Sequence, residues 1–472
     1  MELETLEGGT QEGIDEVLIA ACNERSLAGI AAGIVKDGRV VYAKGFGIAD
    51  AQRGVPITAD TSFRIGSISK TFTAIGLMQL HEQERFKLDE PVNNYLKAYK
   101  IAQPSSSPPV TFRHLLTHTS GIGELRRLSD LLRPTLGLAC KRETSDPARP
   151  LRPNPQGGGP AGHQMGICEP RLRDAGPASR GHQRPTVCRI YARSRFCAAR
   201  NGAHGLPAQR TRTSDDGAGL SNAPARVRPI PYREIIPGPA GSVFSSVNEM
   251  VKYLAALLAS GATDTGQILM PGTLATMMTP HYQLDSRLAA VGLAFMIDRA
   301  DGMQIVGHDG GWPGFTSSMR LAPDRGVGVV VFTNTTTLPL DALARALIRH
   351  ALDAGEPARA KPILEQPTLW NELCGTYRPD CGFNTNLRLW MLGGALRVFA
   401  KRGHLMIGGR LLFGPVRRGL RAYAADPSDP LLFCAELGGI RVMVLFRRNA
   451  VGRVDSMSVA AGAGAFASLK KK

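Results

Sequence analysis

The sequence of 472 residues lacks any long apolar run. No stretch reaches the roughly 18 to 20 apolar residues that a membrane-spanning helix needs. The first residues, MELETLEGGTQ, also lack the basic start and the apolar stretch of a secretory signal peptide. These absences argue against a membrane protein and against secretion, so we expect a cytoplasmic location.

Paired cysteines are also missing. The eight cysteines contain no CxxC pair, and their spacing matches no common set of zinc ligands. We therefore expect reduced thiols, no metal site and no cofactor. Apolar residues make up 43% of the chain and charged residues 21%, which is typical of a globular protein. At this length the chain can form two or three domains with large cores.

The positive charge of the chain is concentrated in one segment. The formal net charge is +17, and such an excess generally suggests nucleic acid or an anionic membrane as a partner. Between residues 141 and 228, 16 Lys and Arg face 6 Asp and Glu, whereas the other 384 residues carry 41 against 34. Because the rest of the chain is close to balanced, we expect neither nucleic acid nor a membrane as a partner.

Residues 141–228, which we call the Arg-rich segment, have few apolar side chains. Only 9 of these 88 residues are Leu, Ile, Val or Phe, and 15 of the 16 cations are Arg. A segment of this composition cannot bury enough apolar surface to fold on its own. The composition predicts that the segment is disordered.

The remaining sequence contains regular helix and strand patterns. Residues 28–50 indicate two strands that turn at Asp37 and Gly38, a strong hairpin signal. Later strands are expected at residues 291–299, 303–311, 316–323 and 326–334. Helices are expected at residues 13–25, 70–84, 248–258 and 339–353, the third capped by Ser245 or Ser246.

These patterns divide the chain into two domains. Residues 1–355, which include the Arg-rich segment, form the first, and residues 356–366 are read as a linker. Short strand-like runs broken by Gly, Pro and Asp follow in residues 367–472. They predict a small antiparallel sheet or barrel.

The stretch FRIGSISKTF places Ser67 and Lys70 three residues apart at the start of an expected helix. Positions i and i+3 share one helix face, so the hydroxyl of Ser67 and the amine of Lys70 can approach hydrogen-bonding distance. A serine hydroxyl needs an adjacent base to act as a nucleophile, and a lysine can serve when its surroundings favour the neutral amine. The backbone N–H of Ser67 would then point toward a developing oxyanion. Taken alone, however, Ser-x-x-Lys recurs by chance in most long proteins.

Further motifs give this tetrad a context. LLTHTSGI follows it, GPAGSVFSSVNEMVKYL precedes the late strands, and GHDGG with PGF comes near the end of the domain. With these motifs in this order, the chain resembles the serine β-lactamase and penicillin-binding-protein superfamily, in its class C-like branch of esterases, peptidases and related hydrolases. The resemblance covers residues 14–140 and 229–350. It implies an α+β fold with an antiparallel sheet flanked by helices, a helical lobe, and a C-terminal accessory domain similar to a small β-barrel.

The resemblance implies roles for the matched residues. Ser67 would be the acylated nucleophile and Lys70 its base partner. The triplet that runs from His308 to Gly310 stands where family members carry Lys-Thr-Gly or His-x-Gly on a strand lining the site. The N–H of Gly311 would complete the oxyanion hole with that of Ser67. His308 would hydrogen-bond a substrate carboxylate or the leaving group, unless it is a structural histidine at a strand end.

One family motif is missing. Family members carry Tyr-x-Asn on a loop between Ser-x-x-Lys and the late strands, and its tyrosine passes a proton to the leaving group. No Tyr-x-Asn occurs in this sequence. The stretch that begins at Ser246 has the form Ser-x-Asn, but we interpret it as a helix cap. Tyr191 lacks the asparagine, and His118, in LLTHTSGI, is expected to serve packing.

A shifted reading frame of the Arg-rich segment could hide the missing motif. Residues 165–170, MGICEP, are encoded by ATG-GGN-ATH-TGY-GAR-CCN. One nucleotide forward, these codons can be read as Trp-Ala-Tyr-Ala-Asn, and the same shift at residues 181–192 permits another family-like stretch. We infer a frameshifted translation over about residues 141–226. A genuine basic insertion and a nucleic-acid-binding arm are the alternatives.

The sequence thus predicts a serine hydrolase that forms an acyl-enzyme on Ser67 with a small ester, amide or β-lactam. His308 in place of a lysine favours an esterase or peptidase, because a permanent cation for a penicillin carboxylate is missing. One alternative is a catalytically impaired pseudo-enzyme that lacks Tyr-x-Asn. Another is a substrate-binding module that uses the C-terminal domain. The sequence leaves the oligomeric state open.

Overall fold

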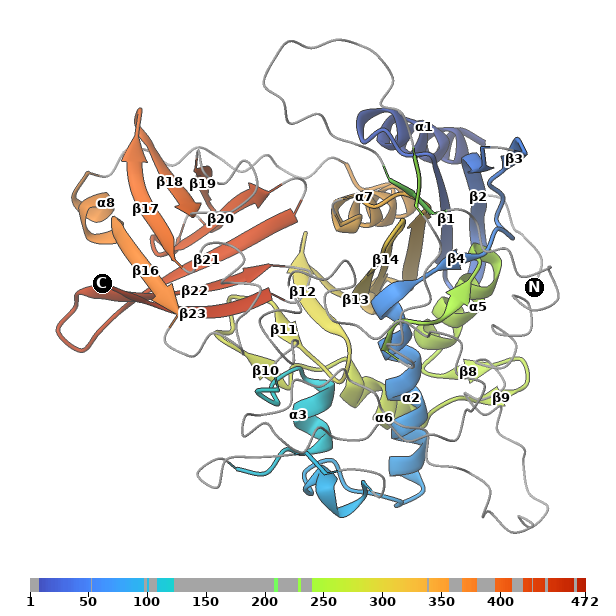
Figure 1. The fold of residues 1–472 in the computed structure, drawn as a ribbon, viewed down its shortest axis with the longest axis horizontal. Coiled ribbons are helices and arrows are strands. Elements are labelled where there is room, and N and C mark those ends of the chain that lie inside the picture. Colours follow the sequence, from blue (N-terminus) through green and yellow to red (C-terminus); the bar gives the residue numbers. More distant parts are fainter. Residues whose placement is uncertain are drawn as a thin grey trace.

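The protein is described by a computed structural model (Figure 1). It describes residues 8–51, 53–96, 100–101, 108–122, 208–210, 228–230, 240–337, 339–355, 367–379, 395–409, 419–426, 428–437, 440–461 and 465–472. The described chain forms a sheet domain followed by a C-terminal barrel. The α+β fold predicted from the sequence is therefore confirmed.

The sheet domain is built on nine antiparallel strands in the order β10-β11-β12-β13-β14-β15-β1-β2-β3. The predicted hairpin is formed by β1 (Gly29–Lys36) and β2 (Arg39–Asp50). Asp37 and Gly38 between them have φ values of 50° and 77°, as a two-residue hairpin turn requires. On its other side β1 pairs with β15 (Val327–Thr333), so an early strand and a late strand are neighbours in the sheet.

The other strands of the sheet mostly follow the predicted pattern. They are β3 (Val55–Pro56), β10 (Tyr282–Gln283), β11 (Ala290–Val291), β12 (Met296–Ala300), β13 (Met303–Trp312) and β14 (Phe315–Ala322). The single strand predicted at residues 291–299 is wrong. The chain reverses there through Ala294, whose φ is 65°, and β11 pairs with β12. The N–H of Ala294 donates to the carbonyl of Leu116, which holds this turn.

Helices cover both faces of the sheet. On one face α1 (Gly8–Glu24) and α7 (Asp341–Ala351) share an apolar core with the central strands. On the other face α2 (Ser69–Glu82) and α5 (Val247–Leu258) do the same. Ser246 caps α5, because its Oγ accepts a hydrogen bond from the N–H of Glu249. The cap interpretation of Ser-x-Asn is thus confirmed.

Smaller elements complete the sheet domain. They are the helices α3 (Phe112–Leu116) and α6 (Pro271–Met277), the 3-10 turns η1 (Gly66–Ile68), η2 (Val92–Asn94) and η6 (Pro323–Arg325), and the short strands β4 (Phe63–Arg64), β5 (Ala208–Arg210), β6 (Arg228–Ile230), β7 (Phe244–Ser245), β8 (Ala262–Thr263) and β9 (Gly266–Gln267). Within the Arg-rich segment the structure describes β5 and the first residue of β6, which pair with each other. The predicted linker, the codons for residues 165–170 and most of the inferred frameshift lie outside the described residues.

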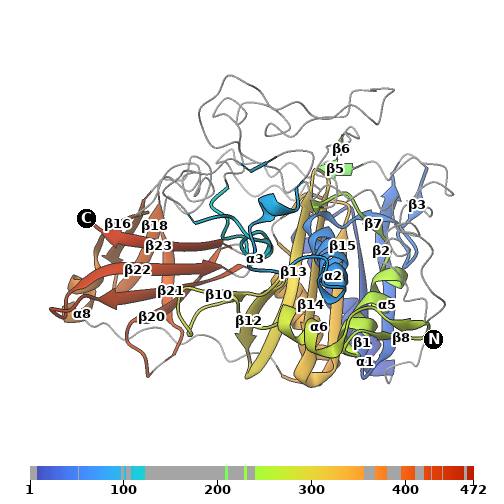
Figure 2. The same ribbon diagram turned by 90° about the horizontal axis from the view of Figure 1, so that it is seen from below.

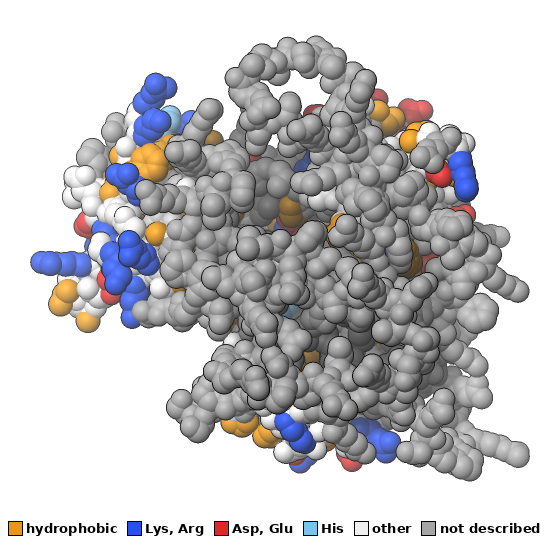
Figure 3. All heavy atoms as spheres, in the orientation of Figure 1, with side chains coloured by type: hydrophobic (Ala, Val, Ile, Leu, Met, Phe, Trp, Pro, Cys, Tyr) orange, Lys and Arg blue, Asp and Glu red, His pale blue; other side chains and the backbone are white. Residues whose placement is uncertain are grey.

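The C-terminal domain is a closed antiparallel barrel, which confirms a barrel rather than an open sheet. After α8 (Pro367–Leu373), its strands are β16 (Gly375–Pro379), β17 (Leu396–Lys401), β18 (His404–Gly409), β19 (Leu420–Ala424), β20 (Leu432–Leu437), β21 (Ile440–Arg448), β22 (Val454–Ala461) and β23 (Ala465–Lys471). Aromatic side chains, Tyr377, Phe433 and Phe446, contribute to its core. On the face shown in Figure 3, the described Lys and Arg side chains over the barrel are mixed with apolar and acidic ones.

The barrel sits beside the β10 edge of the sheet (Figure 2). Leu288, in the connection between β10 and β11, packs in an apolar cluster with Leu432 and Leu445 of the barrel. Next to this cluster, Arg287 donates to the carboxylate of Asp429 at 2.7 Å. The connection between β10 and β11 therefore anchors the barrel. No described helix is long and apolar enough to cross a membrane.

Candidate active site

Ser67 lies in η1, which runs directly into α2, as the sequence predicted for this helix start. Gly66 precedes it with a φ of 51°, a left-handed conformation that favours glycine. A Cβ on Gly66 would lie 2.7 Å from the nitrogen and 2.8 Å from the oxygen of Gly311 in β13. Glycine is therefore needed here for both conformation and space, and this close approach places Ser67 beside β13.

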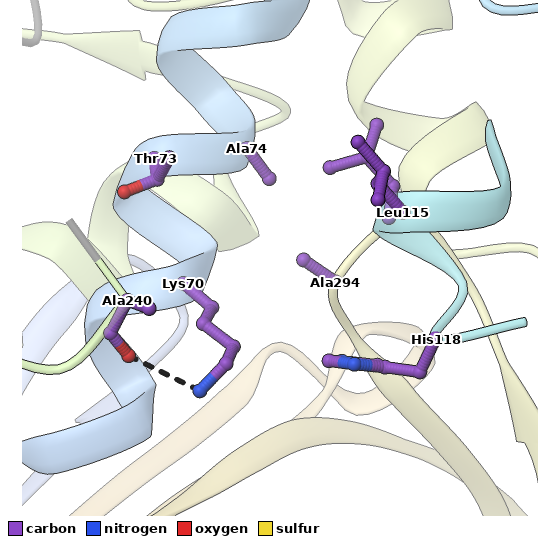
Figure 4. A pocket seen from close by; sticks show the side chains of 8 residues that line it. Lys70, Thr73, Ala74, Leu115, His118, Ala240 and Ala294 are labelled. Atoms are coloured by element: carbon purple, nitrogen blue, oxygen red, sulfur yellow. Dashed lines mark hydrogen bonds between the residues drawn. The ribbon is translucent and has the colours of Figure 1, made fainter. Parts of the chain in front are cut away.

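Ser67 and Lys70 are in direct contact. The Nζ of Lys70 donates to the Oγ of Ser67 at 2.6 Å. It also donates to the carbonyl oxygen of Ala240 at 3.1 Å (Figure 4). Their i and i+3 positions put both side chains on one side of the helix start. This contact is the geometry that a serine nucleophile and an adjacent base require.

The side chain of the neighbouring Ser69 forms hydrogen bonds with backbone groups. Its Oγ donates to the carbonyl of Gly66 at 2.6 Å and accepts from the N–H of Val243 at 3.2 Å. Its side chain is fully buried. Ser69 therefore fixes the turn that presents Ser67 and has no free hydroxyl for chemistry.

Strand β13 brings Gly310 and His308 to the side of η1. A Cβ on Gly310 would lie less than 3.0 Å from the carbonyl oxygen of Ile65 and from the Oγ of Ser317, closer than real Cβ atoms come. Alternate residues of a strand face the same side, so His308 shares the face that Gly310 turns toward η1. The predicted serine, lysine and histidine thus come together from η1, α2 and β13.

Gly311 takes part in the close approach between β13 and η1. Its backbone nitrogen and oxygen lie where a Cβ on Gly66 would point, while nothing lies within 4 Å of a Cβ built on Gly311 itself. The two backbone N–H groups predicted to bind an oxyanion, those of Ser67 and Gly311, are therefore on adjacent segments. Their role in binding an oxyanion stays a prediction.

His308 is buried, with 7% of its surface exposed. Its Nδ1 lies 2.6 Å from the carbonyl oxygen of Asp309, while its Nε2 has no hydrogen-bond partner in the described part of the chain. Burial lowers the pKa of His308 well below its usual value, and the charges of Lys70 and His118 lower this pKa further. The ring is consequently neutral at pH 7.

A buried ion network lies on the opposite face of β13. The carboxylate of Asp309 accepts hydrogen bonds from the Oγ of Ser318 and from Arg320, both at 2.7 Å. Arg320 also donates to Asp341 of α7 at 2.6 Å, and Arg345 pairs with the same carboxylate at 2.9 Å. Burial would raise the pKa of Asp341, but the two arginines outweigh it and lower this pKa. The network ties the strand that carries His308 to β14 and α7.

We expect Arg320→Met to lower the free energy of unfolding by about 3 to 5 kcal/mol, because Asp309 and Asp341 would stay buried without their shared cation. Urea denaturation followed by circular dichroism measures this loss. Arg349→Met is the matched control, because Arg349 forms a partly exposed pair with Asp301 at 3.7 Å, and such pairs contribute about 0 to 1 kcal/mol. Equal losses in the two variants would contradict the network's role.

A pocket opens beside Lys70 (Figure 4). It is lined by Lys70, Thr73, Ala74, Leu115, Leu116, His118, Ala240 and Ala294. His118 has a φ of 59°, and its ring extends into the pocket on the side facing Lys70. The sequence predicted only a packing role for His118, whereas its side chain lines the pocket beside Lys70. The motif LLTHTSGI marked the residue, but no sequence pattern tells which way a loop histidine points.

Metal ligation finds no support in the geometry of the described residues. Among them, no group of three or more His, Cys, Asp and Glu could hold a metal ion. The described cysteines, Cys22, Cys374 and Cys434, are free thiols.

Known proteins share sequence and fold with this chain. The family model described as Beta-lactamase matches residues 14–149 and 193–353, and so leaves out residues 150–192 of the Arg-rich segment. Esterase EstB from Burkholderia gladioli is 37% identical over 111 residues, which are 23% of this chain and 28% of that protein. The match thus spans less than a third of that relative's length.

Two solved structures resemble the whole chain. The one titled "Crystal structure of SurE" has a TM-score of 0.53 at 19% identity, covering 99% of this chain and 100% of that one. The octameric penicillin-binding protein homologue from Pyrococcus abyssi has a TM-score of 0.51 at 19% identity, covering 98% and 100%. At this identity the likeness establishes a common fold.

Proposed function

Because the chain belongs to the Beta-lactamase family, we propose that it is a serine hydrolase that acts through an acyl-enzyme on Ser67. The observation that carries this proposal is the 2.6 Å contact between the Nζ of Lys70 and the Oγ of Ser67. The substrate is a small ester, amide or β-lactam. Identity to an esterase over 111 residues favours esters.

In the proposed acylation the Oγ of Ser67 attacks the carbonyl carbon of the substrate. With Lys70 neutral, the hydroxyl of Ser67 donates across their contact, and its proton passes to the amine. The oxyanion accepts hydrogen bonds from the N–H groups of Ser67 and Gly311. When the bond to the leaving group breaks, the leaving alcohol or amine takes a proton from Lys70, and the acyl group stays on Ser67.

Deacylation repeats these steps with water. A water molecule loses a proton to Lys70 and attacks the acyl carbon, again with the oxyanion held by the two amides. The bond to the Oγ of Ser67 then breaks, and the oxygen takes the proton back from Lys70. The products are the free acid and the starting enzyme, so one base serves both halves of the reaction.

A second candidate, a catalytically impaired protein, is favoured by the absence of Tyr-x-Asn from the sequence. Loss of a group that transfers a proton costs about 10² to 10⁴ in rate. Ser67 would then still be acylated by activated esters, but slowly. The substrate-binding module, based on the barrel, would instead leave Ser67 unreactive.

We expect p-nitrophenyl butyrate to leave a butyryl group on Ser67 of the full-length protein. The reaction is quenched in acid, digested and analysed by mass spectrometry, while p-nitrophenol is followed by absorbance. Steady phenol release with an adduct on Ser67 supports an active enzyme, and a single slow acylation without turnover supports the impaired one. Absence of both signals, or an adduct on another residue, contradicts the proposal.

A further inference from the structure

We propose that the Nε2 of His308 is a hydrogen-bond acceptor which selects substrates that carry a hydroxyl, an N–H or an ammonium group and disfavours those that carry a carboxylate. The inference rests on the proposed function, because it takes the substrate to be held beside Ser67. It deepens that function by naming the substrate class. It also differs from the role that the family resemblance implies, in which His308 hydrogen-bonds a carboxylate.

The contact with Asp309 determines which ring nitrogen carries the hydrogen. A carbonyl oxygen can only accept, so the Nδ1 that lies 2.6 Å from the carbonyl of Asp309 must donate. A neutral imidazole has one N–H, and here it is on Nδ1. The Nε2 of His308 is left with a lone pair and can only accept.

The surroundings of His308 keep it neutral. Burial opposes a charge on the ring, and Lys70 on α2 and His118 after α3 oppose it further when they are protonated, as does Arg320 on the other side of the sheet. The nearby carboxylate of Asp309 is already engaged by Ser318 and Arg320. A proton on Nε2 would therefore add a buried cation among other cations, which burial also opposes.

The unused acceptor belongs to a residue on the side of β13 that approaches η1. His308 is on the face of β13 that Gly310 turns toward the segment before Ser67. Its Nε2 is buried and has no hydrogen-bond partner among the described side chains and backbone groups. Buried polar atoms are nearly always paired in native proteins, so this position suits a donor supplied by a ligand.

The chemistry of the ligand follows from this lone pair. An ionised carboxylate offers only acceptor oxygens. Its oxygen lone pairs would oppose the lone pair of Nε2, and no hydrogen bond would form. A hydroxyl, an N–H or an ammonium group donates to Nε2 directly. Sites built to hydrogen-bond a substrate group discriminate strongly against analogues that lack the group.

Three phenyl butyrates that differ only in the para substituent test this selection. The substituents are hydroxymethyl, methyl and carboxylate, which present a donor, an apolar group and a charged acceptor. At pH 7 we expect kcat/KM for the hydroxymethyl ester to exceed that for the carboxylate ester by about ten- to hundredfold. His308→Leu should remove the advantage of the hydroxymethyl ester over the methyl ester, and His308→Lys, which supplies a cation, should reverse the order in favour of the carboxylate.

The pH dependence of the preference between the esters gives an independent test. As the pH falls through the lowered pKa of His308, Nε2 takes up a proton and becomes a donor. The carboxylate ester should then gain relative to the hydroxymethyl ester in the wild type, but not in His308→Leu. Thermal unfolding of each variant checks that it is folded. An equal preference at all pH values in wild type and His308→Leu would overturn the proposal.

Failure of this inference is distinguishable from failure of the proposed function. Hydrolysis of the methyl ester by wild type but not by Ser67→Ala tests the function alone. Binding of the three esters to Ser67→Ala, measured by calorimetry, tests the selection without turnover. Tighter binding of the hydroxymethyl ester supports the role of His308, and tighter binding of the carboxylate ester contradicts it.

Discussion

Ser67→Ala should lower kcat/KM for p-nitrophenyl butyrate by about 10⁴-fold or more. The variant removes the oxygen that lies 2.6 Å from the Nζ of Lys70, so no acyl-enzyme can form. Only water oriented by the remaining groups could then attack the ester. The fold should persist, because a hydroxyl is replaced by hydrogen at a partly exposed position. Phenol release under steady-state conditions measures the loss, and thermal unfolding checks the fold.

Ser62→Ala is the control for this result. Ser62 precedes Ser67 by five positions and is exposed, so its replacement should leave the rate within about a factor of two. The ratio of the hydrolysis rates of the two variants is informative even if the wild type is slow, because an impaired enzyme still depends on its nucleophile. A Ser67→Ala protein that keeps a tenth of the wild-type rate would contradict the assignment.

Gly310→Ala should produce the second large effect. Its Cβ would lie less than 3.0 Å from the carbonyl oxygen of Ile65, a backbone atom that cannot rotate away. Either β13 or the segment before Ser67 must move, and we expect the free energy of unfolding to fall by about 3 kcal/mol. Because a displacement of about 1 Å at an active site can cost a hundredfold in rate, kcat/KM should fall by about 10² as well.

Gly311→Ala is the matched control for stability. The two glycines are adjacent in β13, but a Cβ on Gly311 would meet nothing within 4 Å. Its free energy of unfolding should stay within about 0.5 kcal/mol of the wild type. Urea denaturation of both variants makes the comparison. Equal destabilisation would show that β13 does not approach Ile65 as closely as described.

Local signals in the sequence predicted much of the sheet domain. Asp37 and Gly38 predicted the hairpin, Ser245 or Ser246 the start of α5, and the tetrad from Ser67 to Lys70 the start of α2. Each signal depends on the residues of a single turn. The reversal at Ala294 could not be predicted, because a positive φ is rare for alanine and is held here by a contact with Leu116, far away in the chain.

Other features of the site depend on packing between distant segments. The sequence predicted that His308 lines the site, but its protonation depends first on burial and then on Lys70, His118 and Arg320, which come from three separate elements. The direction of His118 is set by the loop after α3. Closure of the barrel was left open for a similar reason, since the alternation of side chains predicts strands, whereas closure depends on their tilt and stagger.

The pairing of β1 with β15 has a consequence for synthesis of the chain. The ribosome makes β1 early, but the partner on one of its sides, residues 327–333, emerges only after the Arg-rich segment. The entropy lost on closing this loop grows only with the logarithm of its length, so extra residues between the two strands add little to the cost. Such long-range pairing slows folding. Ser67 is synthesised early, but its contact with β13 can form only after β13 has been synthesised. The site therefore forms only when nearly all of the sheet domain has been translated.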